Sequence, residues 1–186
     1  MRKIGKTIRA VIFGITAALC TLSYAQDSPG SQAPSVTMAP PGITNVTRGT
    51  SGKVELQFRI MHGFHINSNA PTEEYLIPTA LNMEAPTDIV VGRITYPDGQ
   101  NITLPFAPDL KLNVYSGDFS ILVNVRPLSS VIPGKYALHG RLKYQACDKA
   151  ACYPPKEMPV TFEVKVVKGA PAAVRRNPAQ SPHAHY

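Results

Sequence analysis

The sequence predicts an all-β domain, an immunoglobulin-like antiparallel β-sandwich, from three observations. Apolar and polar residues alternate with a period of two in several short runs. Turns rich in glycine and proline separate these runs, and no segment shows the long 3.6-residue period of an amphipathic helix. Strict alternation buries one face of a strand and leaves the other in water, as in antiparallel sheets. Regularly spaced short strands of this kind are typical of a sandwich.

Each predicted strand has its own pattern. Apolar residues occupy every second position in three runs, at 53–60, 135–144 and 160–166. Two shorter β-rich runs cover 89–96 and 119–125. Turn signals lie at 97–99, 116–118 and 133–134. The chain has no tryptophan and lacks the widely spaced cysteine pair of antibody domains, so a true immunoglobulin domain is excluded.

The first 25 residues have the plan of a secretory signal peptide. Four basic residues within 1–9 precede an uncharged stretch, 10–22, that is too short to span a bilayer core of about 30 Å. Small residues at Ser23 and Ala25 then predict cleavage after Ala25. The alternatives are an uncleaved membrane anchor and a lipoprotein modified at Cys20, although Leu19 is an unsuitable neighbour for that modification.

Cleavage changes the net charge and the number of cysteines, from which the class of partner and the redox state would be inferred. The whole chain of 186 residues carries a net charge of +7, but the mature chain has 15 Lys+Arg against 12 Asp+Glu. A balance of +3 gives no reason to invoke nucleic acid. Cys20 leaves with the signal peptide, so two cysteines remain in an oxidising compartment, where disulfides form.

The composition indicates one folded domain with appendages. A content of 44% hydrophobic and 17% charged residues excludes wholesale disorder. Residues 26–41 are rich in Ser, Pro, Gln and Ala and predict a flexible leader, and 169–186 predict a flexible tail. The predicted domain is therefore 42–168.

One segment, 144–155, carries most of the functional information. It joins two alternating strands and contains Cys147 and Cys152 with four residues between them. If the strands pair as a hairpin, the two cysteines lie opposite each other, close enough for a disulfide. The short loop removes little unfolded-state entropy, about 2 kcal/mol, so the spacing fits a redox-active pair as well as a structural staple. Lys149 would favour a nearby thiolate and Asp148 would oppose it.

A metal site is another interpretation of these residues. Two cysteines with two histidines can bind zinc or copper, and His62, His65 and His139 are the candidates. His183 and His185 in the tail are candidates only for adventitious metal. Nothing in the spacing dictates convergence, so no metal and no cofactor is predicted.

The cysteine segment resembles the redox segment of a known family. Tyr144-Gln-Ala-Cys147 followed by Cys152-Tyr-Pro-Pro155 is similar to the N-terminal periplasmic domain of the thiol:disulfide interchange protein DsbD. The segments 63–67, 75–79 and 115–118 support the resemblance, which spans about 43–167.

This resemblance implies an immunoglobulin-like domain, located in the periplasm after export by the signal peptide, with one redox-active cysteine pair. Such a domain accepts electrons from a membrane-embedded donor and passes them to thioredoxin-like periplasmic proteins, among them cytochrome c maturation factors. Cys152 would form the mixed disulfide and Cys147 would resolve it. The chain ends at Tyr186, so we expect the donor to be a separate protein.

The chain departs from the family at the site. The cysteines have one fewer residue between them than in the best-known members, and His65 and Asn67 fall where two tyrosines flank the pair. Phe106 is the candidate for the aromatic residue that shields the cysteines. Tyr144 and Tyr153 are further flanking candidates because they adjoin the cysteine segment.

The sequence thus favours a redox relay, and whether its exchange chemistry counts as enzymatic is open. The alternative is a non-catalytic binding module whose disulfide braces a hairpin.

Overall fold

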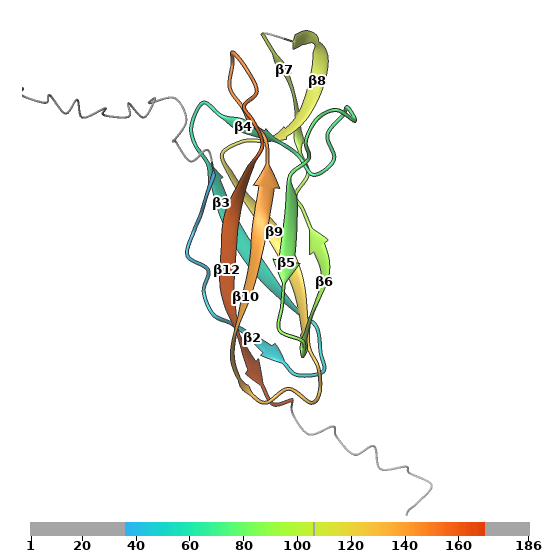
Figure 1. The fold of residues 1–186 in the computed structure, drawn as a ribbon, viewed down its shortest axis with the longest axis vertical. Coiled ribbons are helices and arrows are strands. Elements are labelled where there is room, and N and C mark those ends of the chain that lie inside the picture. The colour runs from blue at the N-terminus through green and yellow to red at the C-terminus, as the bar shows by residue number, and fades with distance from the viewer. Residues whose placement is uncertain (1–35, 106, 170–186) are drawn as a thin grey trace, which may run out of the picture. The chain divides into compact units, whose positions relative to one another are not determined.

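The computed structural model describes residues 36–105 and 107–169, whose regular structure is entirely β (Figure 1). In these residues we find no helix long and apolar enough to cross a membrane. The strands of the described residues are β1 Val36–Met38, β2 Thr44–Thr47, β3 Gly52–Ile60, β4 His65–Asn67, β5 Ala80–Glu84, β6 Ile89–Thr95, β7 Gln100–Leu104, β8 Ala107–Tyr115, β9 Asp118–Pro127, β10 Gly134–Tyr144, β11 Ala146–Cys147 and β12 Lys156–Val167.

The strands form three four-stranded sheets. Sheet A has the order β1-β3-β9-β6, sheet B has β2-β12-β10-β5, and sheet C has β11-β4-β8-β7. Sheets A and B form the sandwich, and sheet C lies at one end of it, uppermost in Figure 1. The predicted immunoglobulin-like β-sandwich is confirmed. One pairing, β2 with β12, is parallel, which alternation cannot reveal because both strand directions share a period of two.

The main core is built from the inward positions of the long strands. In β3 the residues with exposures of 0–3% are every second one, namely Val54, Leu56, Phe58 and Ile60. Strands β9, β10 and β12 contribute in the same way, so apolar side chains of sheets A and B share one cluster. Phe58 stacks on Phe119 with ring centroids 5.2 Å apart. Burial of alternate apolar side chains from both sheets is what holds a sandwich together.

The predicted strands are confirmed, and the first described strand begins before the predicted start of the domain. The five runs correspond to β3, β6, β9, β10 and β12. However, β1 lies within the predicted flexible leader of 26–41, where it pairs with β3 along Val36 to Met38. Val36 is 2% exposed in the main core, so burial outweighs the loop-like composition around it. The predicted signal peptide, residues 26–35 of the leader and all of the tail but Gly169 lie outside the described residues.

Gly140 explains a break in the alternation of β10. It occupies an inward position between Leu138 and Leu142, both fully buried. A Cβ at this position would lie 2.4 Å from the carbonyl oxygen of Asn82 and 2.5 Å from the sulfur of Met83, both on β5. Only glycine permits the close approach of the neighbouring strand here.

Candidate functional site

The two cysteines face each other across a tight hairpin. The Tyr153 N–H donates to the Ala146 carbonyl at 2.8 Å, and the Asp148 N–H donates to the Ala151 carbonyl at 3.0 Å. These bonds flank Cys147 and Cys152, which are therefore a non-hydrogen-bonded antiparallel pair with close side chains. Their Cα atoms are 4.0 Å apart, and a disulfide joins them. The hairpin pairing inferred from the spacing is present.

The two cysteine residues differ sharply in exposure. Cys147 is fully buried, whereas Cys152 is exposed. Cys147 belongs to a second apolar cluster, separate from the main core, with Leu76, Leu104, Leu112 and Val114. Thiol–disulfide exchange requires in-line access to the attacked sulfur. An incoming thiolate can therefore reach Cys152 but not Cys147.

Asp148 organises the turn between the cysteines. Its Oδ1 accepts the backbone N–H groups of Ala150 at 2.7 Å and Ala151 at 2.9 Å, as in an Asx turn. Its Oδ2 accepts the Tyr153 hydroxyl at 2.5 Å. The Tyr153 hydrogen bond, followed by the two backbone bonds, lowers the pKa of Asp148. The same contact raises the pKa of Tyr153, whose ring lies 5.9 Å from that of Phe64 between centroids.

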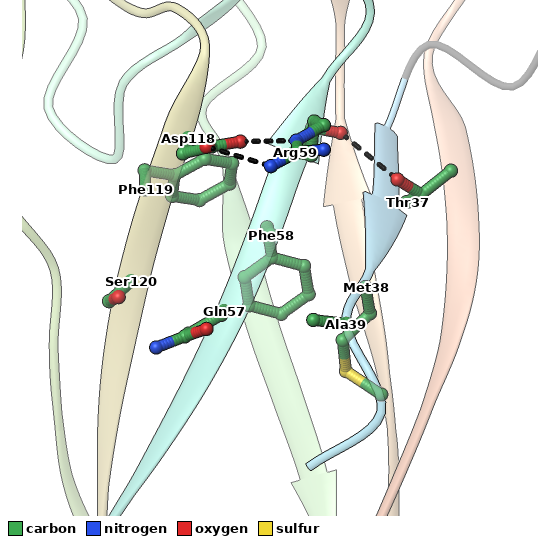
Figure 2. A pocket seen from close by; sticks show the side chains of 9 residues that line it. All are labelled: Thr37, Met38, Ala39, Gln57, Phe58, Arg59, Asp118, Phe119 and Ser120. Atoms are coloured by element: carbon green, nitrogen blue, oxygen red, sulfur yellow. Dashed lines mark hydrogen bonds and ion pairs between the residues drawn. The ribbon is translucent and has the colours of Figure 1, made fainter.

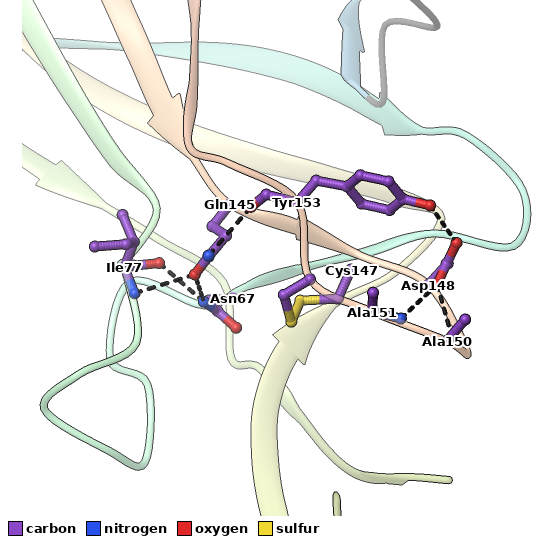
Figure 3. The surroundings of a disulfide bond; sticks show 9 residues. Asn67, Ile77, Gln145, Cys147, Asp148, Ala150, Ala151 and Tyr153 are labelled. Carbon is purple, nitrogen blue, oxygen red and sulfur yellow. Dashed lines mark hydrogen bonds between the residues drawn. A yellow bond between two sulfur atoms is a disulfide. The ribbon is translucent and has the colours of Figure 1, made fainter. Parts of the chain in front are cut away.

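A side-chain network ties the hairpin to sheet C (Figure 3). Gln145 donates from Nε2 to the Tyr153 carbonyl at 3.2 Å, and its Oε1 accepts Nδ2 of Asn67 at 3.2 Å. The Ile77 N–H also donates to that oxygen at 3.4 Å, and the Ile77 carbonyl accepts Asn67 Nδ2 at 3.0 Å. Three chain segments are thus joined without any contribution from the disulfide.

His65 and Asn67 lie on β4, next to the cysteine hairpin. His65 is the register partner of Cys147 in the β4–β11 pair. It is 6% exposed, and its Nε2 is buried without a hydrogen-bond partner. Burial lowers the pKa of His65, and the charge of Asp148 acts in the opposite direction. Asn67 is fully buried, and its Oδ1 also lacks a partner.

The remaining flanking candidates fall elsewhere. Tyr144 is 3% exposed and packs in the main core, with a backbone hydrogen bond at Val36. Tyr153 belongs to the hairpin, but its ring points away from the disulfide, toward Phe64 and Asp148 (Figure 3). Phe106 lies outside the described residues.

Sequence reasoning missed the structural roles of Gln145 and Asp148. An aspartate at the start of a turn is a recognisable signal of an Asx turn, so the role of Asp148 could have been predicted from the sequence. Gln145 had no such signal, because its partners Asn67, Ile77 and Tyr153 come from three separate segments.

The described part of the chain contains no cluster of side chains that would support the predicted alternative of a metal site. No group of three or more His, Cys, Asp or Glu side chains there is arranged to hold a metal. His62 is exposed, whereas His65 is buried. His139 is exposed on β10 and pairs with Thr161 of sheet B, with Nδ1 and Oγ1 3.2 Å apart.

A groove of about 580 Å³ lies on sheet A, lined mainly by residues of β1, β3 and β9 (Figure 2). Its lining includes the rings of Phe58 and Phe119 and the ion pair of Arg59 and Asp118, whose Nε and Oδ1 are 2.6 Å apart. None of its lining residues belongs to the hairpin. We therefore place the candidate site at the exposed disulfide.

Comparisons with known proteins identify a family that matches most of the chain. The family described as "Thiol:disulfide interchange protein DsbD, N-terminal" matches residues 36–163. No curated protein sequence matches the chain.

Solved structures similar to the chain include two from Neisseria meningitidis. One is the DsbD N-terminal domain in its reduced form, with 20% identity over 59% of this chain and 80% of that chain and a TM-score of 0.37. The other is the complex of the DsbD and PilB N-terminal domains, with 20% identity over 59% and 73% and a TM-score of 0.38. The N-terminal periplasmic domain of ScsB from Proteus mirabilis is 12% identical over 68% and 44%, with a TM-score of 0.45.

Proposed function

We propose, from the premise that this chain belongs to the family of DsbD N-terminal domains, that it is a periplasmic thiol–disulfide exchange module. The carrying observation is the pairing of an exposed cysteine with a buried one in a single hairpin. Cys152 is open to a partner, and Cys147 is enclosed beside it. A structural staple has no need of such an asymmetry, whereas a two-step exchange uses both positions.

The difference in exposure supports a separate role for each cysteine. In the reduced protein, the Cys152 thiolate attacks one sulfur of a partner disulfide, and the partner's other sulfur leaves as a thiolate. The Cys147 thiolate then attacks Cys152 Sγ, which forms the intramolecular disulfide and releases the second partner sulfur. Two electrons pass to the partner, and this chain becomes oxidised.

The hairpin keeps the two thiols together between cycles. The backbone bonds on either side of the pair, and the bonds of Gln145 and Asp148, involve no sulfur atom. They hold Cys147 beside Cys152 in the dithiol form as well. Holding reactants side by side makes the resolving step effectively unimolecular and fast.

The partners we propose are thioredoxin-like periplasmic proteins as electron acceptors and a membrane-embedded protein as donor. The family carries this part of the proposal, with cytochrome c maturation as one pathway that it serves. The PilB N-terminal domain in complex with a DsbD N-terminal domain is a solved example of a partner for a related protein.

Trapping tests this function. Cys147→Ala should accumulate a mixed disulfide with an oxidised thioredoxin-like acceptor, because Cys152 attacks and nothing resolves the product. Cys152→Ala is the matched control and should accumulate none. Equal trapping by both variants would contradict the assigned roles, and a disulfide potential below about −300 mV would indicate a staple rather than a relay.

A further inference from the structure

Three residues form a row across one face of sheet C. Cys147 is the register partner of Cys152 on one side and of His65 on the other. Directly opposed residues of antiparallel strands project to the same face, with Cβ atoms about 4.5–5.5 Å apart. The imidazole of His65 therefore lies on the disulfide face, beside the buried sulfur.

His65 has an unmet polar requirement in the disulfide form. The residue is 6% exposed, and its Nε2 is buried with no hydrogen-bond partner. An unpaired buried polar atom costs stability, and native proteins rarely leave one without a reason. The sulfur of a disulfide has no hydrogen to donate, whereas a thiol does.

We propose that Nε2 of His65 is the proton acceptor for the Cys147 thiol, unpaired in the disulfide form and paired with Cys147 Sγ–H in the dithiol form. This inference rests on the proposed function, since it requires the pair to cycle. It gives His65 a part in the resolving step, in which the buried sulfur must lose a proton.

In the mixed disulfide, Cys147 Sγ–H gives its proton to Nε2 of His65, and the thiolate attacks Cys152 Sγ. The Cys147–Cys152 bond forms, and the bond between Cys152 and the partner breaks. The partner sulfur leaves with the electron pair and is protonated, and His65 returns to its neutral form by releasing its proton to solvent.

The surroundings suit a neutral acceptor. The apolar cluster around Cys147 disfavours charge, and burial holds His65 neutral by lowering its pKa. Asp148 on the hairpin is the charged group that opposes this shift. On β8, the residues paired with β4 are Val114 and Tyr115, and the Tyr115 phenol bonds to Asn69. Glu73 and Glu74, in the segment before Leu76, are not buried.

A consequence follows for the redox equilibrium. The hydrogen bond exists only in the dithiol form, so His65 favours reduction. Replacing it with phenylalanine should shift the exchange equilibrium with a reference dithiol about tenfold toward the disulfide, equivalent to about 30 mV. A structural role would instead change the stability of both forms together.

The direct test follows the reaction of reduced protein with Ellman's reagent in a stopped-flow instrument. Cys152 should release a first thionitrobenzoate in forming a mixed disulfide, and the attack of Cys147 should release the second. His65→Gln and His65→Phe should leave the first phase unchanged and slow the second about tenfold or more at neutral pH. His62→Gln, at an exposed histidine, is the matched control and should alter neither phase.

The pH profile separates a proton acceptor from a packing residue. In wild type the second phase should reach its plateau below the ordinary histidine pKa of 6.5, because burial lowers the pKa of His65. In His65→Gln it should follow the thiol, at about pH 8.5 or above. A second phase that is unchanged in the His65 variants overturns the inference. A wild-type pH profile with no inflection below pH 6.5 also overturns it, and this measurement does not require either variant to fold. Absence of any second phase in wild type overturns the proposed function itself.

Discussion

Gln145→Ala tests whether side-chain hydrogen bonds, rather than the disulfide, hold the cysteine hairpin in place. Gln145 makes three bonds, to Asn67 Nδ2 at 3.2 Å, to the Ile77 N–H at 3.4 Å and to the Tyr153 carbonyl at 3.2 Å. Alanine keeps the backbone and deletes all three. Asn67 retains its bond to the Ile77 carbonyl, but the Ile77 N–H and the Tyr153 carbonyl lose these partners.

The expected loss of stability follows from the number of hydrogen bonds deleted and from their partial burial. A neutral hydrogen bond contributes about 0.5–1.5 kcal/mol net, and these bonds are only part-buried, so three of them should amount to about 2–3 kcal/mol. For a domain of this size, that loss should lower the Tm by about 6–15 °C.

The measurement is urea and thermal unfolding of the oxidised protein, followed by circular dichroism. Gln57→Ala, at an exposed position on β3, is the matched control and should change stability by less than about 0.5 kcal/mol. If Gln145→Ala also lowers the free energy of unfolding by less than about 0.5 kcal/mol, the disulfide alone holds the hairpin and the prediction is wrong.

Three other predictions concern the same end of the molecule. Tyr153→Phe removes the main cause of the lowered pKa of Asp148, so wild type should be more stable than the variant at about pH 7. A carboxyl group whose pKa is lower in the folded state stabilises the protein at pH values above its unfolded pKa, and this stability is lost as the pH falls through its folded pKa. The urea midpoints of wild type and Tyr153→Phe should therefore converge in acid, and a difference between them that stays constant with pH would contradict this. Leu112→Ala should cost about 2–5 kcal/mol in urea unfolding, whereas the partly exposed Val90→Ala should cost far less. After reduction, limiting iodoacetamide should modify Cys152 before Cys147 in peptide mapping, and the reverse order would exclude the assigned roles.

The long strands could be predicted because they carry enough residues to display a period. β3, β10 and β12 are each nine or more residues long, and over most of each strand the less exposed side chains alternate with exposed ones, a pattern that the sequence displays. β4 has three residues and β11 has two, which is too short for any period to emerge. These two strands of sheet C, which lie at Cys147, could therefore not be recognised from the pattern, whereas β8 of the same sheet has Leu110, Leu112 and Val114 at every second position and was missed.

At the site, spacing predicted which residues meet but not which are buried. The hairpin relation of Cys147 and Cys152 follows from the four residues between them, whereas their difference in exposure depends on the apolar cluster beneath sheet C. Tyr144, predicted as a flanking residue, packs in the main core. The alternation of β10 already placed it on the inward face, and this evidence outweighs its closeness in sequence to the cysteines.

The separation of the two apolar clusters has a consequence for redox cycling. The main core links sheets A and B, whereas Cys147 packs with Leu76, Leu104, Leu112 and Val114 at the end of the sandwich. A change in the bonding of the Cys147 sulfur therefore affects the smaller apolar cluster and the two-residue strand β11. Proteins open locally where few apolar contacts hold a segment, at a free energy below that of global unfolding. We therefore expect local opening at this end of the sandwich to leave the pairing of the long strands intact.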